Sequence, residues 1–218
     1  MKFLFLGDSI TEGVGASCSR NNYVNLVKSN LNCDVINYGV SGTRIGRQTF
    51  IYDNSNIMRN YDFRLRAQIM VQDADMVFVL GGTNDHAHGN LVLGNVKERT
   101  PHTFCNELRL LIEFLSEKYG KEKLCFLLPP HRFNEEGSPC KGADGNEVGA
   151  NLSEYVAAMR QIITEYGIDI IDLYKNSIPQ PLVNTGDEYT VDGVHPNDNG
   201  HRIIAEKICE YIKRRNKK

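Results

Sequence analysis

Four short polar segments carry side chains that could together catalyse acyl transfer. They are residues 7–13 (Gly-Asp-Ser-Ile-Thr-Glu-Gly), 37–43 (Asn-Tyr-Gly-Val-Ser-Gly-Thr), 81–85 (Gly-Gly-Thr-Asn-Asp) and 192–196 (Asp-Gly-Val-His-Pro). Ser9 supplies a hydroxyl, and His195 can take up its proton because imidazole titrates near neutrality. Asp192 stands three residues before His195, close enough to accept a hydrogen bond from the ring and orient it. These three residue types are the nucleophile, base and acid of a catalytic triad.

Three further groups in these segments could hold the negative charge that develops during acyl transfer. Gly42 offers a backbone N–H, Asn84 offers a side-chain amide, and the backbone N–H of Ser9 is a third donor. Two alternatives stay open for the hydroxyls. Ser9 could serve as the cap of the following helix and have no catalytic part. Ser41 is a rival nucleophile, although the glycines around it favour a tight turn.

Two acids lie beside the candidate residues without an obvious catalytic part. Asp8 precedes Ser9 and Asp85 follows Asn84. Because neighbouring side chains usually point in different directions, we expect both carboxylates to make structural hydrogen bonds.

Short apolar runs alternate with amphipathic stretches along the chain. The pattern predicts strands at residues 2–6, 33–38, 75–80, 124–128 and 168–173, and helices at 23–31, 102–119, 152–166 and 198–213. This alternation favours a three-layer α/β/α sandwich whose five parallel strands have the flavodoxin-like order 2-1-3-4-5. We expect residues 1–218 to form a single domain. Three of the polar segments then follow strands, at the sheet edge where such folds bind ligands, and the fourth precedes the last helix.

In this order the four segments resemble those of the SGNH hydrolases, also called the GDSL esterase/lipase family. The Ser-Gly-Asn-His set of the family falls on Ser9, Gly42, Asn84 and His195, with Asp192 as the triad acid. Ile10 stands where the family name has leucine, a neutral change at a position expected to be buried. The resemblance implies an esterase that works through an acyl-enzyme, with an oxyanion hole formed by Ser9, Gly42 and Asn84.

The substrate we expect is an ester of a short acyl group, such as acetyl, on a carbohydrate or another small soluble alcohol. The chain is compact and has neither a large apolar lid segment nor an apolar helix suited to lipid interfaces. Within the family, a lysophospholipase or thioesterase activity is the alternative. Two alternatives come from other classes of protein. A flavodoxin-like protein is disfavoured because residues 7–13 lack the pattern of a nucleotide-binding loop. A catalytically silent carbohydrate-binding domain is disfavoured because all three triad residues are present.

An arginine-rich stretch follows Gly42. Residues 44–66 hold five arginines against two aspartates, an excess of three positive charges. The default interpretation is a solvated helix face. The functional alternative is recognition of an anionic substrate group, for which Arg44 and Arg47 are the better candidates.

Three histidines are further candidates for substrate binding. His86 and His88 form an H-x-H pair that could ligate zinc, but on an irregular loop the rings need not converge, so we favour a substrate-facing or solvated loop and no metal. His131 follows two prolines at the end of a predicted strand, where it would line the cleft. The glycine-rich segment 134–150 is either a surface loop or a flap.

Composition and net charge exclude further classes of protein. The net charge of −2 gives no basic field for nucleic acid, and no apolar run approaches the ~20 residues of a membrane span. Residues 3–6 are too short for a signal-peptide core, so we expect a cytoplasmic protein whose six scattered cysteines are reduced. We expect an ester and water as its partners and no cofactor; the oligomeric state stays open.

Overall fold

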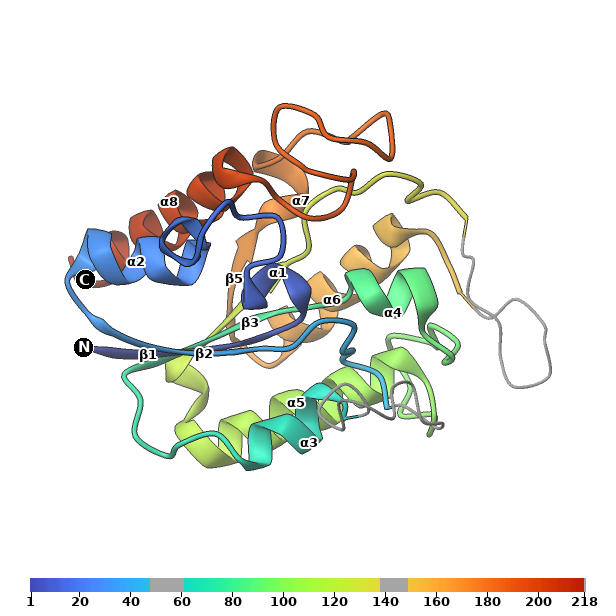
Figure 1. Ribbon diagram of the computed structural model, residues 1–218. Helices are drawn as coiled ribbons and strands as arrows, with labels where there is room; N and C mark the ends of the chain where they lie inside the picture. The colour runs from blue at the N-terminus through green and yellow to red at the C-terminus, as the bar shows by residue number, and fades with distance from the viewer. Residues whose placement is uncertain (48–60, 138–148, 218) are drawn as a thin grey trace.

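Five parallel strands form one sheet in the computed structural model, which describes residues 1–47, 61–137 and 149–217 (Figure 1). The strands are β1 (Lys2–Gly7), β2 (Asp34–Gly39), β3 (Met76–Leu80), β4 (Leu124–Leu128) and β5 (Asp169–Asp172), in the order β2-β1-β3-β4-β5. The predicted fold class and strand order are confirmed.

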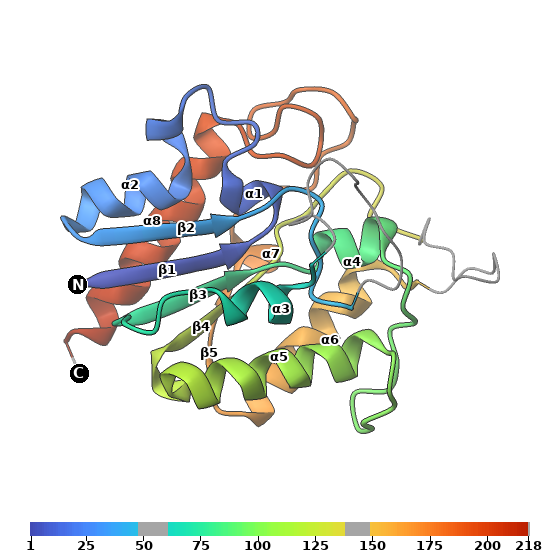
Figure 2. The same cartoon turned by 60° about the horizontal axis from the view of Figure 1, so that its bottom comes forward.

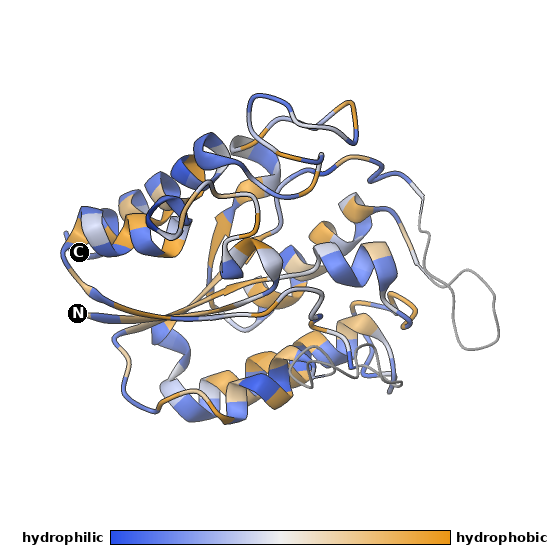
Figure 3. Ribbon diagram, viewed as in Figure 1, coloured by the Kyte–Doolittle hydropathy of each residue, from blue (hydrophilic) through white to orange (hydrophobic). Residues whose placement is uncertain are grey.

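Helices cover both faces of this sheet (Figure 2). One face carries α2 (Tyr23–Leu31) and α8 (Asp198–Arg215), and the other carries α3 (Phe63–Gln68), α5 (Phe104–Tyr119) and α6 (Leu152–Glu165). Alternate residues of β1 enter different cores, because successive side chains of a strand point to opposite faces. Phe3 and Phe5 pack in the core that includes residues of α2 and α8, whereas Leu4 and Leu6 pack in the other. The helices accordingly show an apolar side and a polar side (Figure 3).

The central strands end at one level, and this places the polar segments together. Gly7 at the end of β1 is in register with Gly39 on β2 and with Leu80 on β3. The chain leaves each of these strand ends into one of the segments identified from the sequence. The carboxyl ends of β1, β2 and β3 therefore lie at one edge of the sheet (Figure 2), and the polar segments begin there.

Several short helices lie outside the elements predicted from the sequence. They are α1 (Ser9–Glu12), α3, α4 (Thr83–His88), α7 (Leu173–Asn176) and the 3₁₀ turns η1 (Ser19–Asn21) and η3 (Lys121–Lys123). Elements of three to six residues are too short to show a hydrophobic period. The long predicted helices are confirmed to within two residues at their ends.

The described cysteines are all free thiols. Cys33, Cys105, Cys125 and Cys209 are buried and Cys18 is exposed, while Cys140 lies outside the described residues. Among the helices of residues 1–47, 61–137 and 149–217, none combines the length and the apolar character that crossing a membrane requires.

Candidate active site

Ser9 stands at the first position of α1, directly beyond the end of β1. Asp8 caps this helix, since its Oδ1 accepts the backbone N–H of Ile10 at 3.0 Å. A Cβ on Gly7 would lie 1.9 Å from Thr11 Oγ1, so a side chain at position 7 would collide with the turn that brings α1 back over the strand end. The prediction that Asp8 is a structural hydrogen-bonding group is confirmed, and Ile10 is buried as expected.

Ser9, His195 and Asp192 form a continuous chain of hydrogen bonds. His195 Nε2 lies 2.9 Å from Ser9 Oγ, and His195 Nδ1 lies 2.7 Å from Asp192 Oδ2. The other carboxylate oxygen of Asp192 accepts the backbone N–H groups of Val194 at 3.0 Å and His195 at 2.8 Å. With Nδ1–H donating to Asp192, Nε2 of the neutral ring can accept the proton of the Ser9 hydroxyl.

Asp192 stays ionised in this arrangement. Burial by itself would raise the pKa of the carboxyl group, but hydrogen bonds from the His195 backbone and ring and from the Val194 N–H outweigh it and lower the pKa. An ionised Asp192 can orient the imidazole ring and stabilise its protonated form.

Contacts from two directions hold the 192–196 loop over α1. Gly193 accepts a backbone hydrogen bond from Phe133 at 2.6 Å, which ties the loop to the segment after β4. On the other side, Gly15 has φ +93°, and a Cβ there would lie 2.2 Å from the carbonyl oxygen of Pro196. Only glycine permits this close approach.

Asn84 and Gly42 lie in adjoining segments at the same edge of the sheet. Asn84 Nδ2 donates to the carbonyl oxygen of Thr43 at 3.0 Å, next to Gly42, which has φ +79°. Asn84 Oδ1 lies 3.1 Å from His88 Nε2. The loop that carries Gly42 is joined to the segment before Ser9, because the Val40 N–H donates to the Gly7 carbonyl at 3.1 Å. The three predicted oxyanion donors thus come from directly connected pieces of chain.

The sequence model of the GDSL-like lipase/acylhydrolase family matches residues 5–203 of this chain. The protein belongs to this family. It is accordingly an esterase or acylhydrolase, a serine hydrolase. Its match includes all four segments that meet at the sheet edge.

Relatives and solved structures extend this assignment. The esterase is 24% identical over 218 residues to the mouse isoamyl acetate-hydrolyzing esterase 1 homolog, covering 97% of this chain and 81% of the relative. It is 25% identical over 225 residues to an acetylxylan esterase of Xylanibacter ruminicola, covering 95% of this chain but only 42% of that protein. A crystal structure of a Lactobacillus plantarum protein superimposes with a TM-score of 0.74 at 27% identity, covering 97% of this chain and 96% of the other.

Ser41, the rival hydroxyl, is engaged in a structural contact of the esterase. Its hydroxyl and its backbone N–H both donate to the carboxylate of Glu12, the latter at 2.6 Å. Gly39 permits this contact, because a Cβ there would lie 2.1 Å from the Glu12 backbone nitrogen. Ser41 thus fastens the Gly42 loop to the end of α1.

Arg66 is a buried residue of the esterase that sequence reasoning missed. Its guanidinium donates to the Gly7 carbonyl at 3.0 Å, to Thr43 Oγ1 at 2.6 Å and to the Tyr38 carbonyl, so it joins the ends of β1 and β2. Burial lowers its pKa to about 10. The expected solvated face for residues 44–66 is therefore wrong at Arg66, whose side chain is 2% exposed. No local pattern distinguishes this arginine from Arg47 of the same stretch, which is exposed.

Arg44 is also buried, at 1% exposure, which contradicts the expectation of an accessible guanidinium for an anionic substrate group. Its Nη1 donates to the His88 carbonyl at 2.6 Å, at the C-terminal end of α4. Arg47 is exposed at the end of a described segment, and its part in substrate binding stays a prediction. Asp53 and Arg59 of the same stretch lie outside the described residues.

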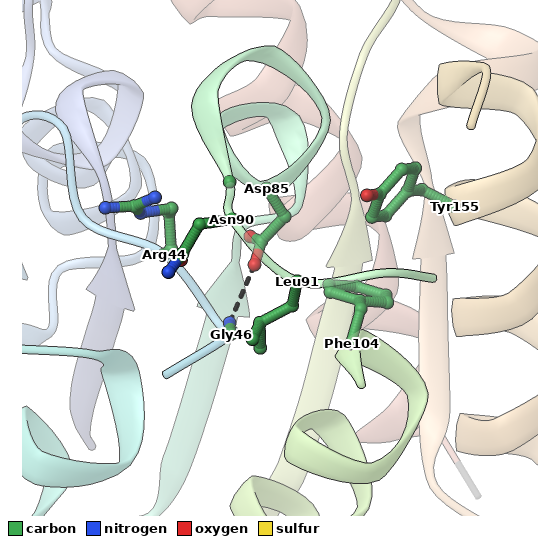
Figure 4. Close-up of a pocket in the computed structure, with 8 residues that line it drawn as sticks. Arg44, Gly46, Asp85, Asn90, Leu91, Phe104 and Tyr155 are labelled. Atoms are coloured by element: carbon green, nitrogen blue, oxygen red, sulfur yellow. Dashed lines mark hydrogen bonds between the residues drawn. The ribbon is translucent and has the colours of Figure 1, made fainter. Parts of the chain in front are cut away.

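Asp85 connects α4 to the chain after β2 (Figure 4). Its carboxylate accepts the backbone N–H of Gly46 at 2.7 Å and that of Ile45 at 3.1 Å. The prediction of a structural hydrogen-bonding group is confirmed. Arg44 and Asp85 line a cavity of about 10 Å³ together with Phe104 and Tyr155.

The H-x-H pair lies on a regular helix, so the prediction of an irregular loop is wrong. A part for His86 and His88 in substrate binding stays a prediction. His86 is fully buried and its Nε2 lies 3.1 Å from the Gly137 carbonyl, whereas His88 contacts Asn84. The two rings therefore have different partners. Burial lowers the pKa of both rings, that of His88 to about 4. Among the described residues, no group of three or more His, Cys, Asp or Glu is placed to hold a metal ion.

His131 is half-buried beside the loop that carries His195. Its Nδ1 lies 2.9 Å from both carboxylate oxygens of Glu135, and its ring packs against Tyr174 with centroids 3.9 Å apart. Its part in substrate binding stays a prediction. Residues 138–148 of the expected loop or flap lie outside the described residues.

Proposed function

We propose that this esterase hydrolyses its substrate through an acyl-enzyme on Ser9. The observation that carries the proposal is the hydrogen-bonded chain from Ser9 Oγ through His195 to Asp192. Ser9 Oγ attacks the ester carbonyl while its proton passes to His195 Nε2. The tetrahedral intermediate then expels the alcohol, which takes the proton from His195. A water deprotonated by His195 attacks the acyl-enzyme and releases the acid, and the proton returns to Ser9.

The oxyanion of each tetrahedral intermediate is held by the backbone N–H groups of Ser9 and Gly42 and by the Asn84 amide. The Asn84 amide nitrogen carries two hydrogens, of which the bond to Thr43 uses one. The second is the donor to the oxyanion. We refer to Ser9, His195 and Asp192 as the proton-transfer group, and to these three donors as the oxyanion group.

The proposed substrate carries a short acyl group, such as acetyl, on a carbohydrate or another small alcohol. Both relatives described above are named for acetate esters, isoamyl acetate in one case and acetylated xylan in the other. The alcohols in these names differ in size and polarity, so the shared acetyl group is the feature we carry over. A long-chain preference, as in a lysophospholipase, is the competing outcome.

Hydrolysis of p-nitrophenyl esters from acetate to laurate tests both parts of the proposal. Wild type is compared with Ser9→Ala and with Ser29→Ala, which removes an exposed hydroxyl on α2. We expect Ser9→Ala to lower turnover by roughly 10³–10⁶-fold. The control variant should match wild type, and kcat/KM should be highest for the shortest esters.

Each part of the proposal has its own contrary result. Near-wild-type turnover by Ser9→Ala would overturn the assignment of the nucleophile. An optimum at long chains would replace the acetyl preference with a lipid-type one. A folded protein that cleaves neither these esters nor sugar acetates would point to a silent binding domain.

A further inference from the structure

We infer that His88 is a positioning residue, which turns the Asn84 amide so that its N–H group faces the oxyanion. The inference rests on the proposed oxyanion group. It gives His88 a defined part in the reaction without contact to the substrate.

Asn84 and His88 are four residues apart on α4, and side chains at this spacing lie on the same face of a helix. His88 Nε2 lies 3.1 Å from Asn84 Oδ1, and Asn84 Nδ2 lies 3.0 Å from the Thr43 carbonyl oxygen. The amide is therefore held at both ends.

The chemistry of these partners fixes which way round the amide lies. A carbonyl oxygen only accepts hydrogen bonds, so the amide nitrogen must face Thr43 and the amide oxygen must face His88. An amide oxygen is also only an acceptor, so His88 Nε2 must carry a hydrogen and donate it. If the amide were reversed, its oxygen would lie against the Thr43 carbonyl oxygen. Thr43 and His88 would then no longer hold an N–H group of Asn84 toward the oxyanion.

His88 is itself held in place from the other side. The buried Arg44 guanidinium donates to the His88 backbone carbonyl at 2.6 Å, which anchors the last residue of α4. Burial, together with the nearby charges of Arg44 and Arg132, lowers the pKa of His88 to about 4, so the ring is neutral near pH 7. A neutral ring with its hydrogen on Nε2 keeps the same donor near pH 7.

His86 shows that this contact is particular to His88. It occupies the same helix two residues earlier, but its Nε2 faces the Gly137 carbonyl. The two histidines that look equivalent in the sequence therefore differ, and only His88 among them contacts the oxyanion group.

A double-mutant cycle tests the inference. Two substitutions form a matched pair: His88→Phe keeps a ring but has no donor, and His88→Gln places an amide N–H where Nε2 lies. We would measure kcat and KM of each single variant, of Asn84→Ala and of the double variant His88→Phe/Asn84→Ala on the p-nitrophenyl ester that wild type cleaves best. His88→Leu serves in place of His88→Phe if thermal unfolding shows that the latter does not fold.

We expect His88→Phe to lower kcat about tenfold, the scale of one neutral hydrogen bond, with KM changed less than about twofold. His88→Gln should recover most of the lost kcat. Asn84→Ala should lower kcat by about 10²–10³-fold, and His88→Phe should then add less than about twofold.

The contrary results separate the two proposals. If Asn84→Ala leaves kcat unchanged, the oxyanion group itself is wrong. If Asn84→Ala is impaired but folded His88→Phe is not, the part given to His88 is wrong. The same conclusion follows if His88→Phe lowers kcat by the same factor in the Asn84→Ala background as in wild type. It also follows if kcat of His88→Gln is no higher than kcat of His88→Phe.

Discussion

The two halves of the proposed active site are held together in different ways. The proton-transfer group joins Ser9 on α1 to His195, which follows 186 residues later on a loop. The Asp192 side chain is 46% exposed. The oxyanion group lies in adjoining segments, in which Ser9 and Asn84 are buried. These segments are linked by bonds between side chains and backbone, such as Asn84 to Thr43 and Arg44 to His88.

This difference follows from what each half has to do. A general base must exchange a proton during every turnover, so it needs a titrating ring and access to water. Donors to an oxyanion are effective when they are fixed in advance and do not titrate. The pH of the medium should therefore act on one half of the site and leave the other unchanged.

Removing the charge of Asp192 should break the first half most severely. Asp192→Asn presents an amide to His195 Nδ1 and favours the wrong ring tautomer, so we expect kcat/KM to fall by about 10³–10⁴-fold. Steady-state kinetics on p-nitrophenyl acetate measures this, with Glu188→Gln as the control because Glu188 is an exposed carboxylate of the same loop. A loss below about tenfold would show that Asp192 does not orient the ring.

The pH dependence of kcat/KM should distinguish the two halves of the site, with an effect smaller than that of Asp192→Asn. As pH falls, the imidazole takes up a proton and stops acting as a base, so kcat/KM should decrease about tenfold per pH unit at the acid end. Asp192 has a lowered pKa and stays ionised over this range, so its carboxylate adds no proton to the decrease. Asn84→Ala should be slower with the same profile shape. A flat profile between pH 5 and 8 would contradict the base.

The smallest expected effect comes from substitution of Asp8 and concerns the stability of the fold. Burial, opposed by a hydrogen bond from Ile10 and by nearby positive charge, raises its pKa from 3.8 to about 7. A carboxyl with a raised folded-state pKa binds its proton more tightly when folded, so unfolding free energy decreases as pH rises from about 4 to about 7. Asp8→Asn cannot lose this proton, so its Tm relative to wild type should increase by a few degrees between pH 5 and 8.

Thermal unfolding by circular dichroism at several pH values measures this difference. Glu117→Gln, which alters an exposed carboxylate on α5, should show no such trend. A Tm difference for Asp8→Asn that does not vary with pH would contradict the raised pKa.

The sequence predicted the sheet well because its signals were long and local. The apolar runs at β1, β3 and β4 are fully buried strands apart from Lys2. Their alternation with amphipathic helices favoured a parallel, doubly wound sheet, and the structure has this sheet in the expected order. The spacing of Asp192 and His195 predicted their contact, because three residues span a single turn. The pairing of Ser9 with His195 could be expected only from the family resemblance and the topology.

The sequence was less informative about the parts that hold the site in place. The helix α4 has six residues, too few for a periodic pattern, and it was expected to be a loop. The charge pattern of residues 44–66 predicts Arg44 and Arg66 to be accessible, although both are buried. Their main-chain partners, Gly7, Tyr38 and His88, lie 28 to 59 residues away, and no local rule identifies such contacts.

The long separation of Ser9 from His195 also has a consequence for synthesis. A nascent chain that has been translated as far as Asp172 contains all five strands but lacks the proposed base. Contacts this distant in sequence close late, after the costly loop between them has been ordered. Esterase activity should therefore appear only after the sheet is complete, once the segment that carries His195 and the helix α8 have docked. A single protease cut within residues 177–191 would divide the nucleophile and the base between two fragments.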